Sequence, residues 1–179
     1  MKDVLMSPEA SGPAIHYYMI RGGTDKRNVT VLESGTVGGE YIKTYGHYHI
    51  GNLDETYWIA EGEGIVILQN RKLDDGGKST EDEVESFQAI AVKKGNSVFI
   101  PSGMGHLLLN TGKTWLVTID NSPVNFEEAD PVSLPGHADY EPVRKMRGFA
   151  YYVVEENGKP TLKKNSKYKN VPEVSIKNS

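Results

Sequence analysis

The chain has 179 residues, a formal net charge of −4 and no cysteine. That length is enough to bury the core of one domain, and the mild acidity excludes the overall positive charge with which proteins bind nucleic acid. Disulfides and thiolate metal sites are excluded, so any metal must be bound through nitrogen and oxygen.

Short runs rich in β-branched and aromatic residues alternate with turns that hold Gly, Asn and Asp. We expect strands over 29–32, 40–44, 56–60, 65–68, 87–92, 97–100, 106–109, 115–119 and 149–154. Many short strands at regular spacing predict an all-β sandwich or barrel. No apolar run approaches the ~18 residues of a membrane helix, and the N-terminal residues hold no apolar signal core, so no membrane partner is expected.

Three segments do not follow this pattern. The acidic run 79–85 is weakly helical and is expected to be a solvated loop. The proline-rich segment 123–142 predicts a long irregular crossing, with at most one helical turn near 125–128. The lysine-rich tail from Lys163 is expected to lie along the surface or to fray.

Three of the five histidines have the spacing of a metal site. His47 and His49 are two residues apart, so a strand would direct both imidazoles to one face. Glu55 follows, and His106 comes much later, after a Pro101–Gly105 turn. Neighbouring strands could bring these groups into a pocket of three imidazoles and one carboxylate. Alone, the first pair fits a solvated strand face equally well.

Two longer strings resemble the signatures of the cupin family. One runs from Gly95 to Asn110 and contains His106. The other holds His47, His49 and Glu55, but it has five residues between His49 and Glu55, and its early glycine lies elsewhere. The resemblance implies an all-β double-stranded β-helix, the jelly-roll cupin barrel. It also implies a single domain over residues 1–179, with the barrel core at about 28–120 and a C-terminal strand and tail over 121–179.

In cupins these positions hold a metal, which would make His47, His49, Glu55 and His106 its ligands. Imidazole and carboxylate suit Fe²⁺, Mn²⁺, Ni²⁺, Co²⁺ or Zn²⁺, and the donor set does not choose among them. Four protein ligands leave two positions open on a six-coordinate ion. Two adjacent oxygens of a substrate could fill these positions, which a closed structural site would not need.

A narrower resemblance comes from the flanking residues, over about 13–165. The stretches 44–49, 55–57, 61–64, 100–106, 148–149 and 155–158 are similar to those of the cupin-type glucose-6-phosphate isomerases. This implies a cytoplasmic homodimer of glycolysis and gluconeogenesis that interconverts glucose 6-phosphate and fructose 6-phosphate. One divalent metal per chain is implied, with Fe²⁺ foremost.

The resemblance also implies roles for single residues. Thr30, Thr44 and Gly46 match the phosphate site, and Glu55 and Tyr57 match the catalytic pair. From the residues alone, the threonines could be ordinary strand residues and Tyr57 a core aromatic. The stretch 136–140 resembles a Gly-His-Asp-Tyr element with an inserted alanine, which implies sugar contacts from His137 and Tyr140.

Two other functions remain open on the sequence. A metal-dependent cupin oxygenase or decarboxylase would use the same four ligands but no phosphate site. A non-enzymatic sugar-binding cupin would usually carry an effector domain, and no helix-turn-helix is visible. For an isomerase, the sequence does not decide between proton transfer by Glu55 through a cis-enediol and a direct hydride shift.

Overall fold

Two strands at the centre of the protein are buried on both faces. The computed structural model describes residues 1–23, 25, 27–123 and 138–178. Strands β7 (Glu63–Leu73) and β10 (Gly105–Asn110) pair antiparallel. On β7, Ile65 and Ile67 pack into one apolar cluster, while Val66 and Leu68 pack into another. The central sheet therefore has a core on each side.

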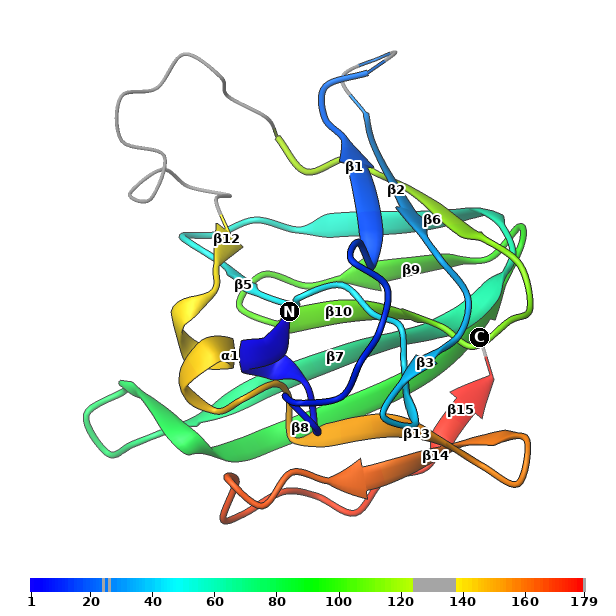
Figure 1. Ribbon diagram of the computed structural model, residues 1–179. Helices are drawn as coiled ribbons and strands as arrows, with labels where there is room; N and C mark the ends of the chain where they lie inside the picture. The colour runs from blue at the N-terminus through cyan, green and yellow to red at the C-terminus, as the bar shows by residue number, and fades with distance from the viewer. Residues whose placement is uncertain (24, 26, 124–137, 179) are drawn as a thin grey trace.

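A five-stranded antiparallel sheet covers the core that contains Val66 and Leu68, and it lies in the upper part of Figure 1. Its order is β1-β2-β11-β6-β9. The bounds are Tyr17–Ile20 for β1, Asn28–Leu32 for β2, Leu116–Asp120 for β11, Glu55–Glu61 for β6 and Ser97–Ile100 for β9. The alternating burial of β2, β6 and β11 reflects a sheet with one face on the core.

The central sheet has the order β10-β7-β8-β15, and a third sheet with the order β14-β13-β4-β3 covers its other side. The remaining elements are β8 (Ser79–Lys93), β15 (Ile176–Asn178), β14 (Lys159–Lys164), β13 (Tyr151–Glu156), β4 (Glu40–Tyr41), β3 (Thr36–Val37), β5 (Tyr48–His49), β12 (Ala138–Asp139), the 3₁₀ turn Lys2–Val4 and α1 (Glu141–Lys145).

The five-stranded and central sheets face each other as a double-stranded β-helix. The predicted jelly-roll barrel of the cupins is confirmed.

The expected loop over 79–85 was wrong, because these residues begin the 15-residue strand β8. They pair with the far end of β7 in a long hairpin. Cationic partners offset the acidic charge of this run. Lys72 lies 3.0 Å from Glu83, Lys145 lies 2.7 Å from Glu81, and Lys169 lies 2.6 Å from Asp82. Cross-strand pairing of an exposed hairpin therefore decided the conformation, rather than local propensity.

The C-terminal tail lies mostly at the surface, as expected, but it also forms strands that the sequence did not predict. Residues 159–164 form β14, and β15 adds a parallel edge to β8. Tyr168, only 4% exposed, packs into the core between them. The sequence also did not predict α1, which begins with Glu141 and Pro142. The helical turn expected near 125–128 lies outside the described residues.

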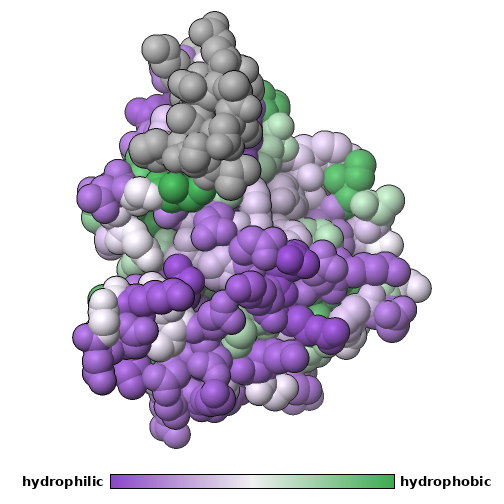
Figure 2. Space-filling view, turned by 90° about the vertical axis from the view of Figure 1, so that its left-hand side faces the viewer, coloured by the Kyte–Doolittle hydropathy of each residue, from purple (hydrophilic) through white to green (hydrophobic). Residues whose placement is uncertain are grey.

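No helix in the described part of the chain is both long and apolar enough to cross a membrane. Figure 2 shows the side of the molecule that carries α1 and the tip of the β7–β8 hairpin. Below the grey segment, that side is mostly hydrophilic.

Candidate metal centre and adjoining pocket

Three imidazoles converge at one end of the barrel. Backbone bonds place His47 opposite His106: His47 N donates to His106 O at 3.2 Å, and His106 N donates to His47 O at 2.9 Å. Their ring centroids lie 4.5 Å apart, and that of His49 lies 5.0 Å from each. One nitrogen from each ring falls within 4.8 Å of the others. The spacing of two residues therefore places both early imidazoles on the same face, as predicted.

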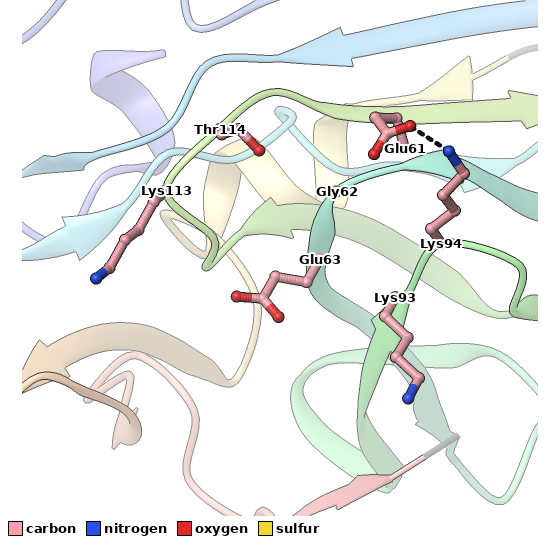
Figure 3. Close-up of a pocket in the computed structure, with 7 residues that line it drawn as sticks. All are labelled: Glu61, Gly62, Glu63, Lys93, Lys94, Lys113 and Thr114. Carbon is pink, nitrogen blue, oxygen red and sulfur yellow. Dashed lines mark hydrogen bonds and ion pairs between the residues drawn. The ribbon is translucent and has the colours of Figure 1, made fainter.

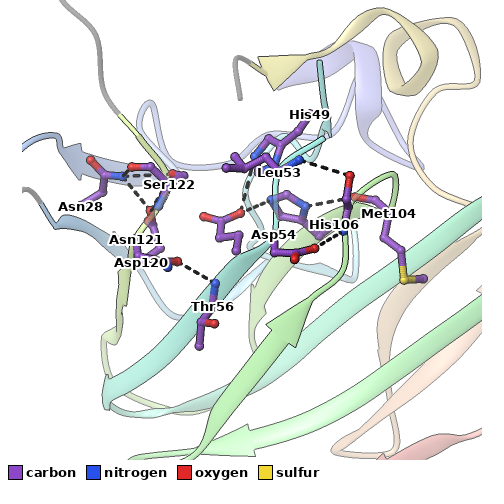
Figure 4. Close-up of polar contacts among 12 residues, drawn as sticks. Asn28, His49, Leu53, Asp54, Thr56, Met104, His106, Asp120, Asn121 and Ser122 are labelled. Carbon is purple, nitrogen blue, oxygen red and sulfur yellow. Dashed lines mark hydrogen bonds and ion pairs between the residues drawn. The ribbon is translucent and has the colours of Figure 1, made fainter. Parts of the chain in front are cut away.

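Glu55, the first residue of β6, lies against two of these rings. Its Oε2 is 3.1 Å from Nε2 of His106 and 3.5 Å from Nε2 of His49. The loop before it is held from both sides: Leu53 N donates to Ser102 Oγ at 3.2 Å, and Ser102 N donates to Asp54 Oδ1 at 2.8 Å (Figure 4). The five-residue spacing that departs from the cupin signature still brings Glu55 to the imidazoles.

The contacts of His106 define which nitrogen faces the carboxylate. Its Nδ1 lies 3.5 Å from the carbonyl oxygen of Met104, which favours a proton on Nδ1 and leaves the lone pair of Nε2 facing Glu55. Neither His106 Nε2 nor Glu55 Oε2 has a hydrogen-bond partner, and both are buried. Two unpartnered lone pairs at 3.1 Å repel each other unless a cation lies between them.

Burial also sets the charge of the other two rings. It lowers the pKa of His47 well below its usual value, with further lowering by His106 and His49. Burial, followed by the proximity of His106, lowers the pKa of His49 to about 4. Both imidazoles are neutral at pH 7, the form that coordinates metals. These two neutral imidazoles, the unpartnered Nε2 of His106 and the unpartnered carboxylate oxygen of Glu55 fit a divalent transition-metal ion.

Tyr48, between His47 and His49, points the opposite way and anchors the strand in the core. Gln69 Nε2 donates to Tyr48 Oη at 3.0 Å and to Tyr168 Oη at 3.2 Å. The Tyr48 ring packs directly on Gly105, where a Cβ atom would lie 2.5 Å from it. The core therefore fixes the strand from which two of the imidazoles project.

A pocket adjoins the imidazoles and brings together most residues matched to the substrate site. The lining residues come from strands of the five-stranded sheet, from the 44–47 segment, from β10 and from the residue before α1. They are Tyr17, Met19, Thr30, Thr44, Tyr45, Gly46, His47, Tyr57, Leu108, Thr118 and Tyr140. Its free volume is about 20 Å³, which is room for about one water molecule. A ligand larger than a water molecule would enter only if the lining side chains moved apart.

Gly46 has a conformation that no other residue would adopt easily. Its φ is +79°, and a Cβ atom there would lie 2.5 Å from Cε2 of Phe149 and 3.1 Å from Cβ of Leu107. The backbone between Thr44 and His47 therefore lies flat against the core and faces the pocket.

The hydroxyl groups of the pocket include one, from Thr118, that was not among the predicted site residues. Thr118 on β11 is 1% exposed and pairs directly with Thr30 on β2. Both side chains point to the pocket. In the sequence, the one sign of a polar role for Thr118 is that it is the only hydroxyl residue in the apolar run 116–119.

Lys43, next to Thr44, points away from the pocket and donates to the Val4 carbonyl at 2.7 Å. It also pairs with Glu40.

Tyr57 lies between the carboxylate and the pocket. It is two residues after Glu55 on the inward face of β6, and its ring centroid is 5.6 Å from that of His106. Burial raises its pKa well above the usual value, with the charge of Glu55 as the next cause. Tyr57 therefore remains a neutral phenol that can donate a hydrogen bond but cannot act as a base at neutral pH.

Tyr140 covers the pocket from the other side. Its ring lies 5.4 Å from the ring of His47 and meets Tyr45 edge-on at 5.4 Å. It is 40% exposed, so it separates the pocket from solvent on one side. His137, the other residue predicted from the same stretch, lies outside the described residues.

A buried polar cluster closes the pocket end of β2 and β11 (Figure 4). Asn28 Nδ2 donates to Asp120 Oδ1 at 2.7 Å, and Ser122 Oγ donates to the same oxygen at 2.7 Å. Asp120 pairs with Tyr57 in the sheet register. The cluster fixes the strand ends behind Tyr57, and no motif in the sequence predicts it.

A larger depression, of about 380 Å³, lies at the other end of β6 (Figure 3). Its lining includes Glu61, Glu63, Lys93, Lys94 and Lys113. Lys94 Nζ donates to Glu61 Oε2 at 2.6 Å, and both side chains are exposed. It brings together no buried polar atom lacking a partner, so the chemistry of the described residues is concentrated at the imidazole end.

The sequence model of one protein family, described as Glucose-6-phosphate isomerase (GPI), matches residues 18–170. Curated relatives called glucose-6-phosphate isomerase include proteins of Thermococcus litoralis, 34% identical over 142 residues, and Pyrococcus horikoshii, 31% identical over 142 residues. These alignments cover 78% and 79% of this chain, and 62% and 63% of the relatives. The chain thus spans less than two thirds of the length of these relatives.

Similarity to solved structures is weak. A recombinant oxalate oxidase in complex with glycolate is 18% identical, with a TM-score of 0.44 over 63% of this chain and 54% of the other. The protein TT1209 from Thermus thermophilus is 18% identical, with a TM-score of 0.41 over 64% of this chain and 90% of the other. The assignment of the fold rests on the strand pairing described above.

Proposed function

Because the chain belongs to the glucose-6-phosphate isomerase family, we propose that it is an aldose–ketose isomerase that interconverts glucose 6-phosphate and fructose 6-phosphate. The supporting observation is the position of the imidazole–carboxylate cluster at the mouth of a threonine-lined pocket. An acid–base group beside a pocket of hydroxyl groups suits a phosphorylated, polyhydroxy substrate.

We propose His47, His49, Glu55 and His106 as ligands of one divalent metal ion, with Fe²⁺ foremost and Mn²⁺, Ni²⁺, Co²⁺ or Zn²⁺ as alternatives. The neutral imidazoles and the unpartnered oxygen of Glu55 support this assignment. When bound, such an ion supplies Lewis-acid stabilisation of charge on neighbouring oxygens.

The remaining residues have roles in binding and proton transfer. The hydroxyl groups of Thr30, Thr44 and Thr118 and the backbone at Gly46 would bind the phosphate. Tyr140 would cover the sugar, together with His137. Tyr57, a neutral phenol, would donate a hydrogen bond to a sugar oxygen.

Glu55 is the proposed base. Its carboxylate would remove the proton from C2 of the open-chain aldose and return it to C1, through a cis-enediol. A direct hydride shift would leave Glu55 without this role. Isomerisation in D₂O separates the two routes, because only proton exchange at Glu55 introduces deuterium from solvent into the product.

Membership of the family also supports three further proposals: that the protein is a homodimer, that it is cytoplasmic, and that it acts in glycolysis and gluconeogenesis.

The test of the activity supplies fructose 6-phosphate to metal-loaded protein and detects glucose 6-phosphate with a coupled dehydrogenase, in air and without oxygen. We expect steady turnover in both conditions. Turnover that requires O₂ with another substrate would identify an oxygenase, and ligand binding without turnover would identify a sugar-binding protein.

A further inference from the structure

A buried ion pair lies behind the segment that lines the pocket, and the proposed chemistry does not use it. Glu40 pairs with Lys43, and their side chains are only 1% and 3% exposed. Moving two charges out of water is costly, so an apolar pair of similar volume would often stabilise a fold equally well. The pair is therefore better explained by the arrangement that it imposes on its neighbours than by its contribution to stability.

The pair holds the N-terminal turn, residues 2–6, by its backbone. Lys43 Nζ donates to the Val4 carbonyl at 2.7 Å, and Met6 N donates to Glu40 Oε2 at 2.8 Å. The side chain of Val4 is fully buried and packs into the larger apolar cluster. Because both polar contacts are made to main-chain atoms, the two charges fix where the turn lies.

The N-terminal turn contacts the residues on both sides of Thr44. Lys43, which precedes Thr44, bonds to the turn directly. Tyr45 follows Thr44; burial raises the pKa of its hydroxyl, and the charge of Asp3 in the turn is the next cause. Helix α1, which Tyr140 precedes, also packs on the turn (Figure 1). The turn therefore supports three residues that line the pocket: Thr44, Tyr45 and Tyr140.

The segment 44–47 depends on such support because it leaves the regular ladder with β10. Thr44 N donates to Leu108 O at 2.9 Å, but Leu108 N donates to the side chain of Thr44 instead of a backbone carbonyl. The next backbone bond to β10 is made by His47. Between these two residues, in the part of the chain that the structure describes, no backbone group bonds to another. Contacts outside the sheet therefore help to set the position of this stretch.

We propose that the Glu40–Lys43 pair positions the phosphate-binding segment by holding the N-terminal turn against it. The inference rests on the proposed function, in which Thr44 and the backbone at Gly46 bind the phosphate. Glu40 and Lys43 would be positioning residues, since neither lines the pocket. The turn precedes residues 18–170, which the family model matches, so membership of the family does not imply this role.

The first test replaces both charges at similar volume, in the double variant Glu40→Gln/Lys43→Met. Because the metal centre is untouched, we expect KM for fructose 6-phosphate to rise by about tenfold while kcat stays within about twofold, the pattern of weakened substrate binding. The matched control is Lys72→Met/Glu83→Gln, which removes an ion pair of 3.0 Å from the β7–β8 hairpin and should leave both constants unchanged. An unchanged KM, or a kcat that falls as far as KM rises, would overturn the proposal.

The second test remains informative if the double variant does not fold. Met6→Pro removes the N–H that donates to Glu40, and the extended backbone of Leu5, with φ of −86° and ψ of 145°, suits a residue before proline. Met6→Ala is the control, because it shortens the side chain and keeps the N–H. We expect KM to rise in Met6→Pro and to stay unchanged in Met6→Ala.

Hydrogen exchange reports on the segment without any turnover. We expect the amide of Thr44 to exchange at least about tenfold faster in Met6→Pro than in Met6→Ala, with the amides of β7 unchanged, because the opening is local. A parent protein without isomerase activity would contradict the proposed function, and this measurement would still decide whether the turn holds the segment. Equal exchange at Thr44 in the two variants would overturn the inference.

Discussion

Glu55 combines a position beside two imidazoles with an oxygen that has no hydrogen-bond partner. Glu55→Gln keeps the shape and one oxygen donor but removes the base. We expect the variant to retain part of its metal through the three imidazoles and to lose on the order of 10²–10⁴ in kcat. Steady-state turnover and metal content per chain, measured on the same sample, check this. Turnover close to that of the parent would rule out proton transfer by Glu55.

Thr44 offers a hydroxyl group to the pocket while its Oγ1 accepts a bond from Leu108 N at 3.1 Å. Thr44→Val keeps the shape and removes the donor. For a hydrogen bond to a charged phosphate we expect a loss of ~1.5–3 kcal/mol in substrate binding, seen as a higher KM.

Thr44→Ser is the matched control for this variant, because it restores the hydroxyl and should restore KM. The thermal midpoint of both variants shows how much the lost Leu108 contact contributes. Equal losses for phosphorylated and free sugars in Thr44→Val would show that Thr44 does not contact phosphate.

The site was predictable where chemistry coincides with spacing. His47, His49 and His106 could be identified because few arrangements of histidine suit a β-barrel metal centre, and the structure brings them together. Thr118 gave only a weak signal, as the one hydroxyl in the apolar run 116–119, and Tyr17 gave none. Only the register of β1, β2 and β11, which pairs Thr118 with Thr30 and Tyr17 with Leu32, brings both side chains to the pocket.

At the scale of elements, the turn before β5 depends on one glycine. Gly46→Ala would combine an unfavourable φ of +79° with a Cβ atom 2.5 Å from the Phe149 ring. Gly103→Ala has a similar φ of +82° but no atom within 4 Å of the new Cβ. We expect Gly103→Ala to cost about 1–2 kcal/mol of stability, the usual penalty for this backbone region, and Gly46→Ala to cost clearly more. Denaturant unfolding of both variants checks this, and equal losses would show that Phe149 yields easily.

Most strands could be predicted from alternation and turn residues, because β2, β6, β9 and β11 each place one face on a core. Two strand segments were not predicted, for the same reason. The acidic start of β8 and the lysine-rich tail carry no local strand signal. They are ordered by partners distant in the sequence, as when Glu83 pairs with Lys72 and Ile176 aligns with Ala89. Single-sequence patterns do not contain such pairings.

At the scale of the whole molecule, a metal ion would connect β5, β6 and β10 at one point. It would bind the folded chain and not the unfolded one, so it should raise the thermal midpoint by mass action. We expect a chelator to abolish activity and lower the midpoint, and added Fe²⁺, Mn²⁺ or Ni²⁺ to restore both. In His106→Ala the midpoint should not respond to metal. A chelated sample with full activity would remove the metal from the proposed function.

The two sides of the site are attached to parts of the fold with very different local stability. His106 projects from β10, a strand buried on both faces, where amide hydrogens exchange only on extensive unfolding. Tyr17 and Met19 project from β1, an edge strand that can detach locally. Mild denaturant should therefore speed hydrogen exchange at β1 at concentrations that leave β10 unchanged. The protein would then lose its affinity for substrate well before it releases its metal.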